Sequence, residues 1–238
     1  MTENTAVISV EEQLKARLAV QAKVASEMAG GGSQISFKGG QIIIDNQIVP
    51  GGEMNVIILG VLNERTYYPG QFDPNKIQIP VCYSYDGQLP HADAADPQHS
   101  NCRGCPQDAW GSANTGRGKA CREAARLAVI SADADFETAP IYTCRVPISS
   151  ISTVRELTGK AASAGKLVAQ FITKLIVKPD AKTFFSVTLM AINNNPIDLG
   201  LLLPRVNEAE TALYRPYPSI EEEAAPEKPV DKHGKAKY

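Results

Sequence analysis

The sequence predicts a mainly β protein with helical additions, an α+β fold class, on three observations. Its 238 residues are 43% hydrophobic and 21% charged, as in ordinary globular domains. About seven short segments rich in β-branched and apolar residues recur along the chain, separated by Gly, Pro, Asn and Asp. A helical pattern interrupts the later segments. The chain therefore has enough apolar sequence for one body built mostly from strands.

The first predicted strands form hairpins. Residues 34–37 and 41–44 flank Lys38-Gly39-Gly40, and glycine tolerates the positive φ that a tight turn requires. Asp45-Asn46 makes a second turn before the apolar pair Ile48 and Val49. These turn signals predict three short strands in succession.

Longer strands and two helices follow. Residues 54–62 form a β-branched run suited to a central strand, and Thr153 with Glu156 predicts the capped start of a helix toward Gly165. A short helix is expected after Pro204. The other predicted strands are residues 77–83, 125–130, 141–146, 171–177 and 183–192, the last two joined around Pro179-Asp180. This arrangement suits a small β-barrel of the OB type with insertions, and a β-sandwich fits the strand count nearly as well.

The predicted organisation has three parts. Residues 1–32 combine an amphipathic helix over residues 9–29 with a Gly30-Gly31-Gly32 linker. Residues 33–215 form the OB-like domain, which carries an insertion at residues 82–121. Residues 216–238 have almost nothing to bury and predict a disordered, charged tail.

Bulk composition restricts the setting in which the protein works. No window approaches the roughly 18 uninterrupted apolar residues of a membrane span, and the first residues lack the pattern of a secretory signal. We therefore expect a cytoplasmic protein, in which cysteines serve metals or catalysis more often than disulfides. The formal net charge is -2, so any nucleic-acid contact has to be local.

Four cysteines predict one structural zinc site. Cys102-Arg103-Gly104-Cys105 is a CxxC knuckle, and Cys82 and Cys121 bracket the surrounding loop. Four thiolates satisfy a closed tetrahedral Zn²⁺ site that has no open position for chemistry. Residues 84–119 have almost no aliphatic content, so metal binding would supply the free energy that orders them.

Two alternatives to a four-cysteine zinc site remain, and the fifth cysteine has a separate expected role. A redox CxxC should open a helix after a strand, whereas this one lies among Asn, Gly and Pro. His91 or His99 could replace Cys82 as a ligand, although loop histidines are more often solvated. The fifth cysteine, Cys144, lies on one face of an alternating strand and is expected to be a buried apolar residue.

Aromatic and basic residues near the insertion predict a nucleic-acid interface. Residues 101–126 hold five Lys and Arg against Asp108 and Glu123, a local excess of three positive charges. Single-strand binding needs exposed rings for bases and cations for the backbone. Trp110 either shields the zinc or stacks on a base. The candidate nucleic-acid-binding residues are Tyr67, Tyr68, Tyr83, Tyr85, Arg103, Trp110, Arg117, Lys119, Arg122 and Arg126.

No catalytic constellation is recognisable. The sequence has no Gly-rich phosphate loop, no HExxH motif and no deaminase spacing, and its histidines fall in predicted loops or in the tail. We therefore predict that the protein is not an enzyme and name no catalytic residue.

Several motifs resemble a known pattern. These are Pro80-Val81-Cys82-Tyr83-Ser84, Cys102-Arg103-Gly104-Cys105-Pro106, Trp110-Gly111-Ser112 and Gly118-Lys119-Ala120-Cys121-Arg122. Together they look like a pattern in bacteriophage and prophage proteins, which are similar in turn to phage single-stranded DNA-binding proteins with an OB-type barrel and a zinc insertion. The likeness is good over residues 80–130 and holds elsewhere only in outline.

The resemblance implies non-sequence-specific coating and protection of single-stranded DNA during phage replication or recombination, in the cytoplasm of an infected bacterium. It implies partners among phage replication or recombination proteins and further copies of the chain, with no membrane. The tail departs from the pattern, because its acidic run at residues 221–223 is followed by four lysines. The alternative function is a zinc-stabilised structural or interaction protein that self-assembles or docks a protein partner.

Overall fold

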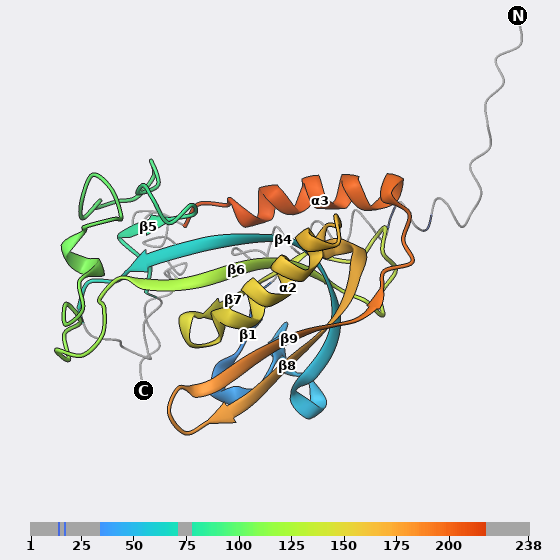
Figure 1. Cartoon of the computed structure of the whole chain (residues 1–238), viewed down its shortest axis with the longest axis horizontal. Helices are drawn as coiled ribbons and strands as arrows, with labels where there is room; N and C mark the ends of the chain where they lie inside the picture. Colours follow the sequence, from blue (N-terminus) through green and yellow to red (C-terminus); the bar gives the residue numbers. More distant parts are fainter. Residues whose placement is uncertain (1–13, 15–16, 18–33, 71–77, 218–238) are drawn as a thin grey trace, which may run out of the picture.

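The computed structural model describes residues 14, 17, 34–70 and 78–217. They form a mixed α+β structure, mostly β-sheet with two α-helices, as Figure 1 shows. The mainly β fold class predicted from the sequence is confirmed. Among the described residues, no helix is long and apolar enough to cross a membrane.

The main sheet is antiparallel and runs in the order β7-β6-β4-β8-β9, with β5 paired to one end of β4. Its strands are β4 (Glu53–Tyr67), β5 (Cys82–Ser84), β6 (Arg122–Ser131), β7 (Tyr142–Pro147), β8 (Phe171–Asp180) and β9 (Phe184–Asn194). The 15-residue strand β4 has a neighbour on each edge: β8 pairs with residues 53–57, and β6 pairs on the other edge with residues 56–66. A register shift between Ile58 and Gly60 interrupts the pairing with β6. β4 is thus the strand that holds the two halves of the sheet together.

A second, small sheet packs beside the first. It consists of β1 (Ile35–Ser36), β2 (Ile43–Ile44) and β3 (Gln47–Ile48) in that order. Asp45 and Asn46 have φ values of 49° and 64°, the left-handed region that a tight hairpin turn between β2 and β3 requires. Gln34 makes a parallel bridge to Thr143, which places this sheet against the β7 edge.

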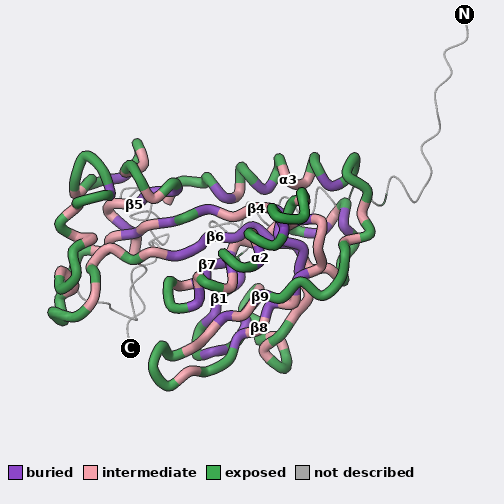
Figure 2. The backbone as a smooth tube through the Cα atoms, viewed as in Figure 1, coloured by how far each residue is buried: buried purple, intermediate pink, exposed green. Residues whose placement is uncertain are grey.

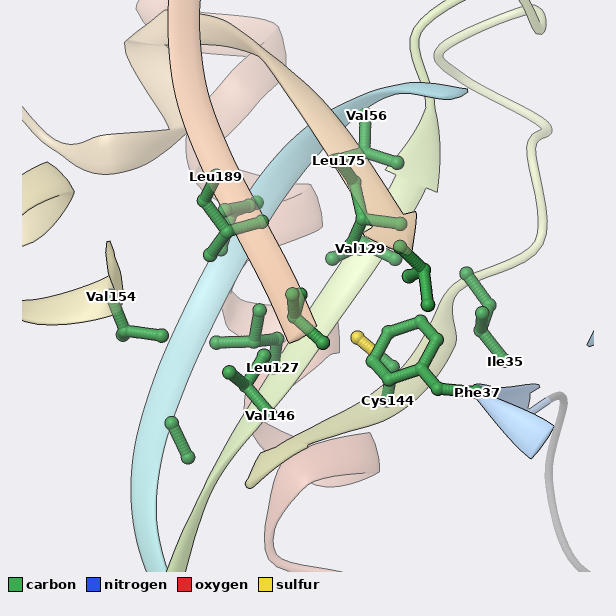
Figure 3. Close-up of a cluster of buried hydrophobic side chains, with 14 of the residues drawn as sticks. Ile35, Phe37, Val56, Leu127, Val129, Cys144, Val146, Val154, Leu175 and Leu189 are labelled. Carbon is green, nitrogen blue, oxygen red and sulfur yellow. The ribbon is translucent and has the colours of Figure 1, made fainter. Parts of the chain in front are cut away.

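One apolar core lies inside the curved sheet. Val56 of β4, Leu127 of β6 and Leu175 of β8 are fully or almost fully buried there, and α2 (Ile151–Ser163) closes it with Val154 and Leu157. Figure 3 shows these side chains converging with those of the small sheet. Cys144 is 2% exposed within this core, so its predicted role as a buried apolar residue is confirmed.

A second core lies on the outer face of β4 and β6, under α3 (Leu199–Leu213). Leu202, Ala209 and Leu213 of this helix are buried against the sheet. The Asp198 carboxylate caps the helix by accepting a 2.7 Å hydrogen bond from the Gly200 amide. Figure 1 shows α3 lying along the sheet on the side opposite to the β8–β9 hairpin.

Most predicted elements are confirmed, and three need correction. The predicted strand 77–83 is reduced to β5, since residues 78–81 are not strand and Pro80 has no N–H for a ladder. Thr153 does not cap α2; its hydroxyl donates to the Ser150 carbonyl, and Ser150 is the N-cap. The last helix begins before Pro204 and contains it. The short 3-10 helices are Lys38–Gly40, Pro50–Gly52, Pro106–Asp108, Ile148–Ser150 and Val168–Gln170.

The predicted N-terminal helix lies outside the described residues except for Leu14 and Arg17, which are helical and exposed. The predicted tail lies outside them beyond Tyr217.

Candidate functional site

The four predicted zinc ligands line one cavity. Cys82, Cys102, Cys105 and Cys121 all border a space of about 20 Å³, together with Arg65 and Asp108. That volume holds about one water-sized sphere. The strand β5 brings Cys82 to this place, the knuckle brings Cys102 and Cys105, and Cys121 directly precedes β6. Gly104 has a φ of 81°, a left-handed conformation that favours glycine inside the knuckle.

The thiols are near neighbours without forming a finished ligand shell. Burial raises the pKa of Cys121 to about 12; the Arg65 guanidinium opposes this shift, and the charges of Cys102 and Cys82 add to it. Yet no three His, Cys, Asp or Glu side chains of the described part of the chain are arranged as a formed metal site. The shared cavity and the sulfur donors are what fit Zn²⁺, which would favour the thiolate forms that burial disfavours.

His91 and His99 behave differently from the cysteines. The His91 ring stacks on Tyr83 at a centroid distance of 4.9 Å and lies 3.1 Å from its hydroxyl. His99 borders the cysteine cavity, where its Nδ1 lies 2.9 Å from the Asn101 carbonyl oxygen. His99 is therefore the histidine that could substitute for a cysteine ligand.

A charged clamp fastens the insertion to the sheet. Arg65 of β4 lies 3.1 Å from Asp108 and 3.7 Å from Glu123, and Lys119 lies 2.8 Å from Asp108. Burial alone would raise the pKa of the Asp108 carboxyl, but Lys119 and Arg65 hold this pKa below its ordinary value. Lys119 is thus engaged within the insertion, although its side chain is 40% exposed.

A larger cavity, of about 540 Å³, lies at the edge of β6 and β7. Four of its lining residues are cationic: Lys38, Arg122, Arg126 and Arg145. None of the described residues that line it is acidic. Aromatic rings complete the wall: Phe37 and Phe185 contact each other at 6.2 Å, and Tyr217 borders the same space. We call this space the arginine cavity.

A buried carboxylate holds two of these arginines. Glu64 is 0% exposed and pairs with Arg126 at 3.3 Å and with Nε of Arg145. The Tyr217 hydroxyl donates to Glu64 at 2.7 Å, and Arg126 also donates to the Tyr85 hydroxyl at 3.1 Å. Burial alone would lower the pKa of the Arg145 guanidinium, but the Glu64 charge raises this pKa above its ordinary value. Two guanidinium groups share one carboxylate, so the cluster keeps a net positive charge.

The structure corrects two of the predicted DNA contacts. Tyr83 and Tyr85 are 2% and 5% exposed, because the rings pack on each other, on His91 and on Tyr217 or Tyr214. The expectation that they present open faces to bases is wrong. Their aromatic faces are used inside the protein, under the segment that follows α3.

The other predicted DNA contacts lie at the arginine cavity, at the cysteine cavity or on the exposed surface of the insertion. Arg122 and Arg126 line the arginine cavity, and the Arg122 guanidinium lies 5.9 Å from the Tyr68 ring. Tyr67 borders the cysteine cavity. Arg103 and Arg117 are exposed on the insertion and line neither cavity.

Trp110 is 82% exposed and does not line the cysteine cavity. The interpretation in which it shields the metal is therefore wrong. Its role as a ring that stacks on bases stays a prediction.

Sequence reasoning missed Lys38, Arg145, Phe185 and the buried Glu64. Arg145 alternates with the core residues Cys144 and Val146, and a charge at that spacing was a usable signal. No sequence signal marked Lys38 or Phe185, because their nearness to β6 depends on how segments far apart in the chain pack.

Comparisons of the chain with protein-family models, with curated proteins and with solved structures found no match.

Proposed function

We propose that this chain is a non-enzymatic, zinc-stabilised protein that binds single-stranded DNA without sequence specificity, on an OB-type barrel. The observation that carries the proposal is the arginine cavity, with four cationic residues on its wall and no acidic one among the described residues. Phosphates are bound by such cations, and the half-buried rings of Phe185 and Tyr217 offer flat surface to bases at this wall.

The strand order supports the OB assignment. In an OB barrel the first strand pairs with the second and the fourth, the third pairs with the second, and the fifth pairs with the fourth. β4, β6, β7, β8 and β9 pair in this order, with α2 between the third and fourth strands. β7 and β9 are not paired, so the barrel would be a partly open one.

The position of the cavity supports the ligand. OB domains bind oligonucleotides on the face of their second and third strands, between the loop that joins strands one and two and the loop that joins strands four and five. The arginine cavity lies on β6 and β7, and the cysteine insertion occupies the first of these loops. Figure 1 shows the insertion and the tip of the β8–β9 hairpin projecting toward the same end of the molecule.

Zinc has a structural role in this proposal. Cys82, Cys102, Cys105 and Cys121 would close the coordination shell, so the ion would order the insertion and supply no chemistry. The ion pair between Arg65 and Asp108 would then hold the ordered insertion against β4, next to the arginine cavity. The resemblance of the cysteine motifs supports a setting in phage replication or recombination in the bacterial cytoplasm.

The test is a fluorescence anisotropy titration of an oligo-dT strand at several salt concentrations. We expect tight binding at low salt, and we expect Lys38→Ala with Arg122→Ala to reduce the slope of log K against log salt by roughly two. Lys160→Ala, on the exposed face of α2 and paired with Glu156, is the control that should leave the slope unchanged. Absence of binding by the wild-type chain at low salt would remove the proposal.

One observation favours the alternative, a structural or interaction protein. Leu199, Leu201 and Leu203 at the start of α3 are 46–50% exposed, an apolar concentration that an assembly surface would cover. Light scattering separates the two functions, because an assembly protein should oligomerise without DNA.

A further inference from the structure

Phe184 is the most exposed of the large hydrophobic residues that the structure describes, at 88%. It lies at the start of β9, beside the tip of the β8–β9 hairpin. Figure 2 shows this tip as mostly exposed, and residues 181–184 are all exposed. No aromatic or cationic side chain in the described part of the chain makes a ring contact with it, so the protein's own packing does not explain why a large ring is there.

The backbone of Phe184 is also unfavourable. Its φ is 69°, in the left-handed region that a bulky side chain rarely adopts and that Gly or Asn fills at hairpin turns. The turn itself is held by Asp180, whose carboxylate accepts from the amides of Lys182 at 2.9 Å and Thr183 at 2.8 Å. The hairpin therefore keeps a strained aromatic residue where Gly or Asn would relieve the strain. A local outlier of this kind points to a contact made with another molecule.

The surroundings of Phe184 indicate what that molecule is. Phe185, the next residue, borders the arginine cavity, and Lys178 before the turn and Lys182 within it are exposed. Asp180, the carboxylate nearest to the turn in sequence, is turned inward onto backbone amides. A flat apolar face on a hairpin with two exposed lysines, one residue from a side chain that borders a cationic cavity, matches a nucleobase followed by its phosphate.

We infer that Phe184 is a base-stacking residue, which holds one base of a single strand whose backbone passes through the arginine cavity. The inference rests on the proposed function and deepens it, because it places a specific contact on the hairpin. The ring is 88% exposed and therefore open to the ligand.

The test uses two substitutions of the full-length chain. Phe184→Asn removes the ring and relieves the backbone, so we expect its thermal midpoint to rise by about 2–4 °C while affinity for oligo-dT falls about tenfold. Phe184→Trp keeps a stacking face and should keep the affinity. Met190→Asn, at a 51% exposed position on the same strand, is the control for general loss of apolar surface.

A spectroscopic readout adds a direct measurement. Trp110 is the single tryptophan of the chain, so Trp110→Phe combined with Phe184→Trp places the only indole at position 184. Oligo-dT should quench its fluorescence, since stacked bases quench indole.

The outcomes separate the two proposals. Tight oligo-dT binding that Phe184→Asn leaves unchanged would overturn the stacking role and leave DNA binding standing. No binding by the wild-type chain would overturn both. A change in the oligomeric state of Phe184→Asn without DNA would show that Phe184 contacts another protein copy, which also overturns the inference.

Discussion

The Arg65 guanidinium lies 3.1 Å from the Asp108 carboxylate, and through this pair β4 is joined to the cysteine insertion. Both side chains are mostly buried, at 16% and 20% exposed. Arg65 also borders the cysteine cavity. The same strand therefore carries Arg65 toward the insertion and its neighbour Glu64 toward the arginine cavity, because successive strand residues point to opposite faces.

Replacing Asp108 should loosen the insertion. Asp108→Asn removes the charge that Arg65 and Lys119 share, and we expect a loss of about 1–2 kcal/mol of stability, discounted for the partly exposed Lys119. Limited proteolysis should show faster cleavage within residues 84–119. Asp133→Asn, at an exposed position after β6, should leave the cleavage rate as in the wild type.

The same pair predicts a pH dependence. Because the pKa of Asp108 is lowered in the folded protein, the unfolded chain binds a proton at higher pH than the folded one. The contribution of Asp108 is therefore complete above its ordinary pKa of about 3.9 and is lost as pH falls below it. Urea unfolding at pH 7 and pH 3 should show the wild type and Asp108→Asn converging at the lower pH; an equal gap at both would contradict the assignment.

Metal removal should affect the insertion and spare the main sheet. We expect elemental analysis to find one zinc ion per chain. Cys105→Ser, or treatment with a strong chelator, should remove the bound zinc and expose residues 84–119 to protease. The core closed by α2 contains no residue of the insertion, so most of the circular dichroism signal should remain. Cys144→Ala is the matched control, because this buried cysteine lies in the core closed by α2 and should not change zinc content.

Glu64 should be the charged position of the main sheet whose replacement costs the most stability. Glu64→Gln leaves Arg126 and Arg145 without their buried counter-charge, and we expect a loss of about 3–5 kcal/mol in urea unfolding. Glu156→Gln, on the surface of α2, should leave the midpoint where it is. If Glu64→Gln also matched the wild type, the buried ion pairs would contribute nothing to the fold.

Trp110 offers an optical test of DNA contact on the cysteine insertion. As the single tryptophan and 82% exposed, it should be quenched when oligo-dT is added. Trp110→Ala should weaken binding about tenfold if the ring stacks on a base. Unchanged fluorescence on saturation would show that the bound strand does not reach the insertion.

Much of the local structure could be predicted from the sequence. The Asp45-Asn46 turn, the hairpin that joins β8 and β9, and the buried Cys144 follow from preferences that act over a few residues. The helix α2 was found in the right place with the wrong cap, because cap geometry depends on how the chain leaves β7. The clustering of Tyr83 and Tyr85 inside the protein had no local signal, since their neighbours come from the segment after α3.

The sequence by itself determined the strands, the central helix and the four cysteines that the fold brings to one small cavity. Only the tertiary structure decided that Lys38, Arg122, Arg126 and Arg145 share another cavity, that Glu64 pairs with two of them, and that Trp110 faces water. The physical reason is the distance along the chain over which the determining interactions act. Turns and strand patterns depend on adjacent residues, whereas a cavity wall is built by the register of strands distant in the chain, and exposure depends on what the rest of the protein leaves uncovered.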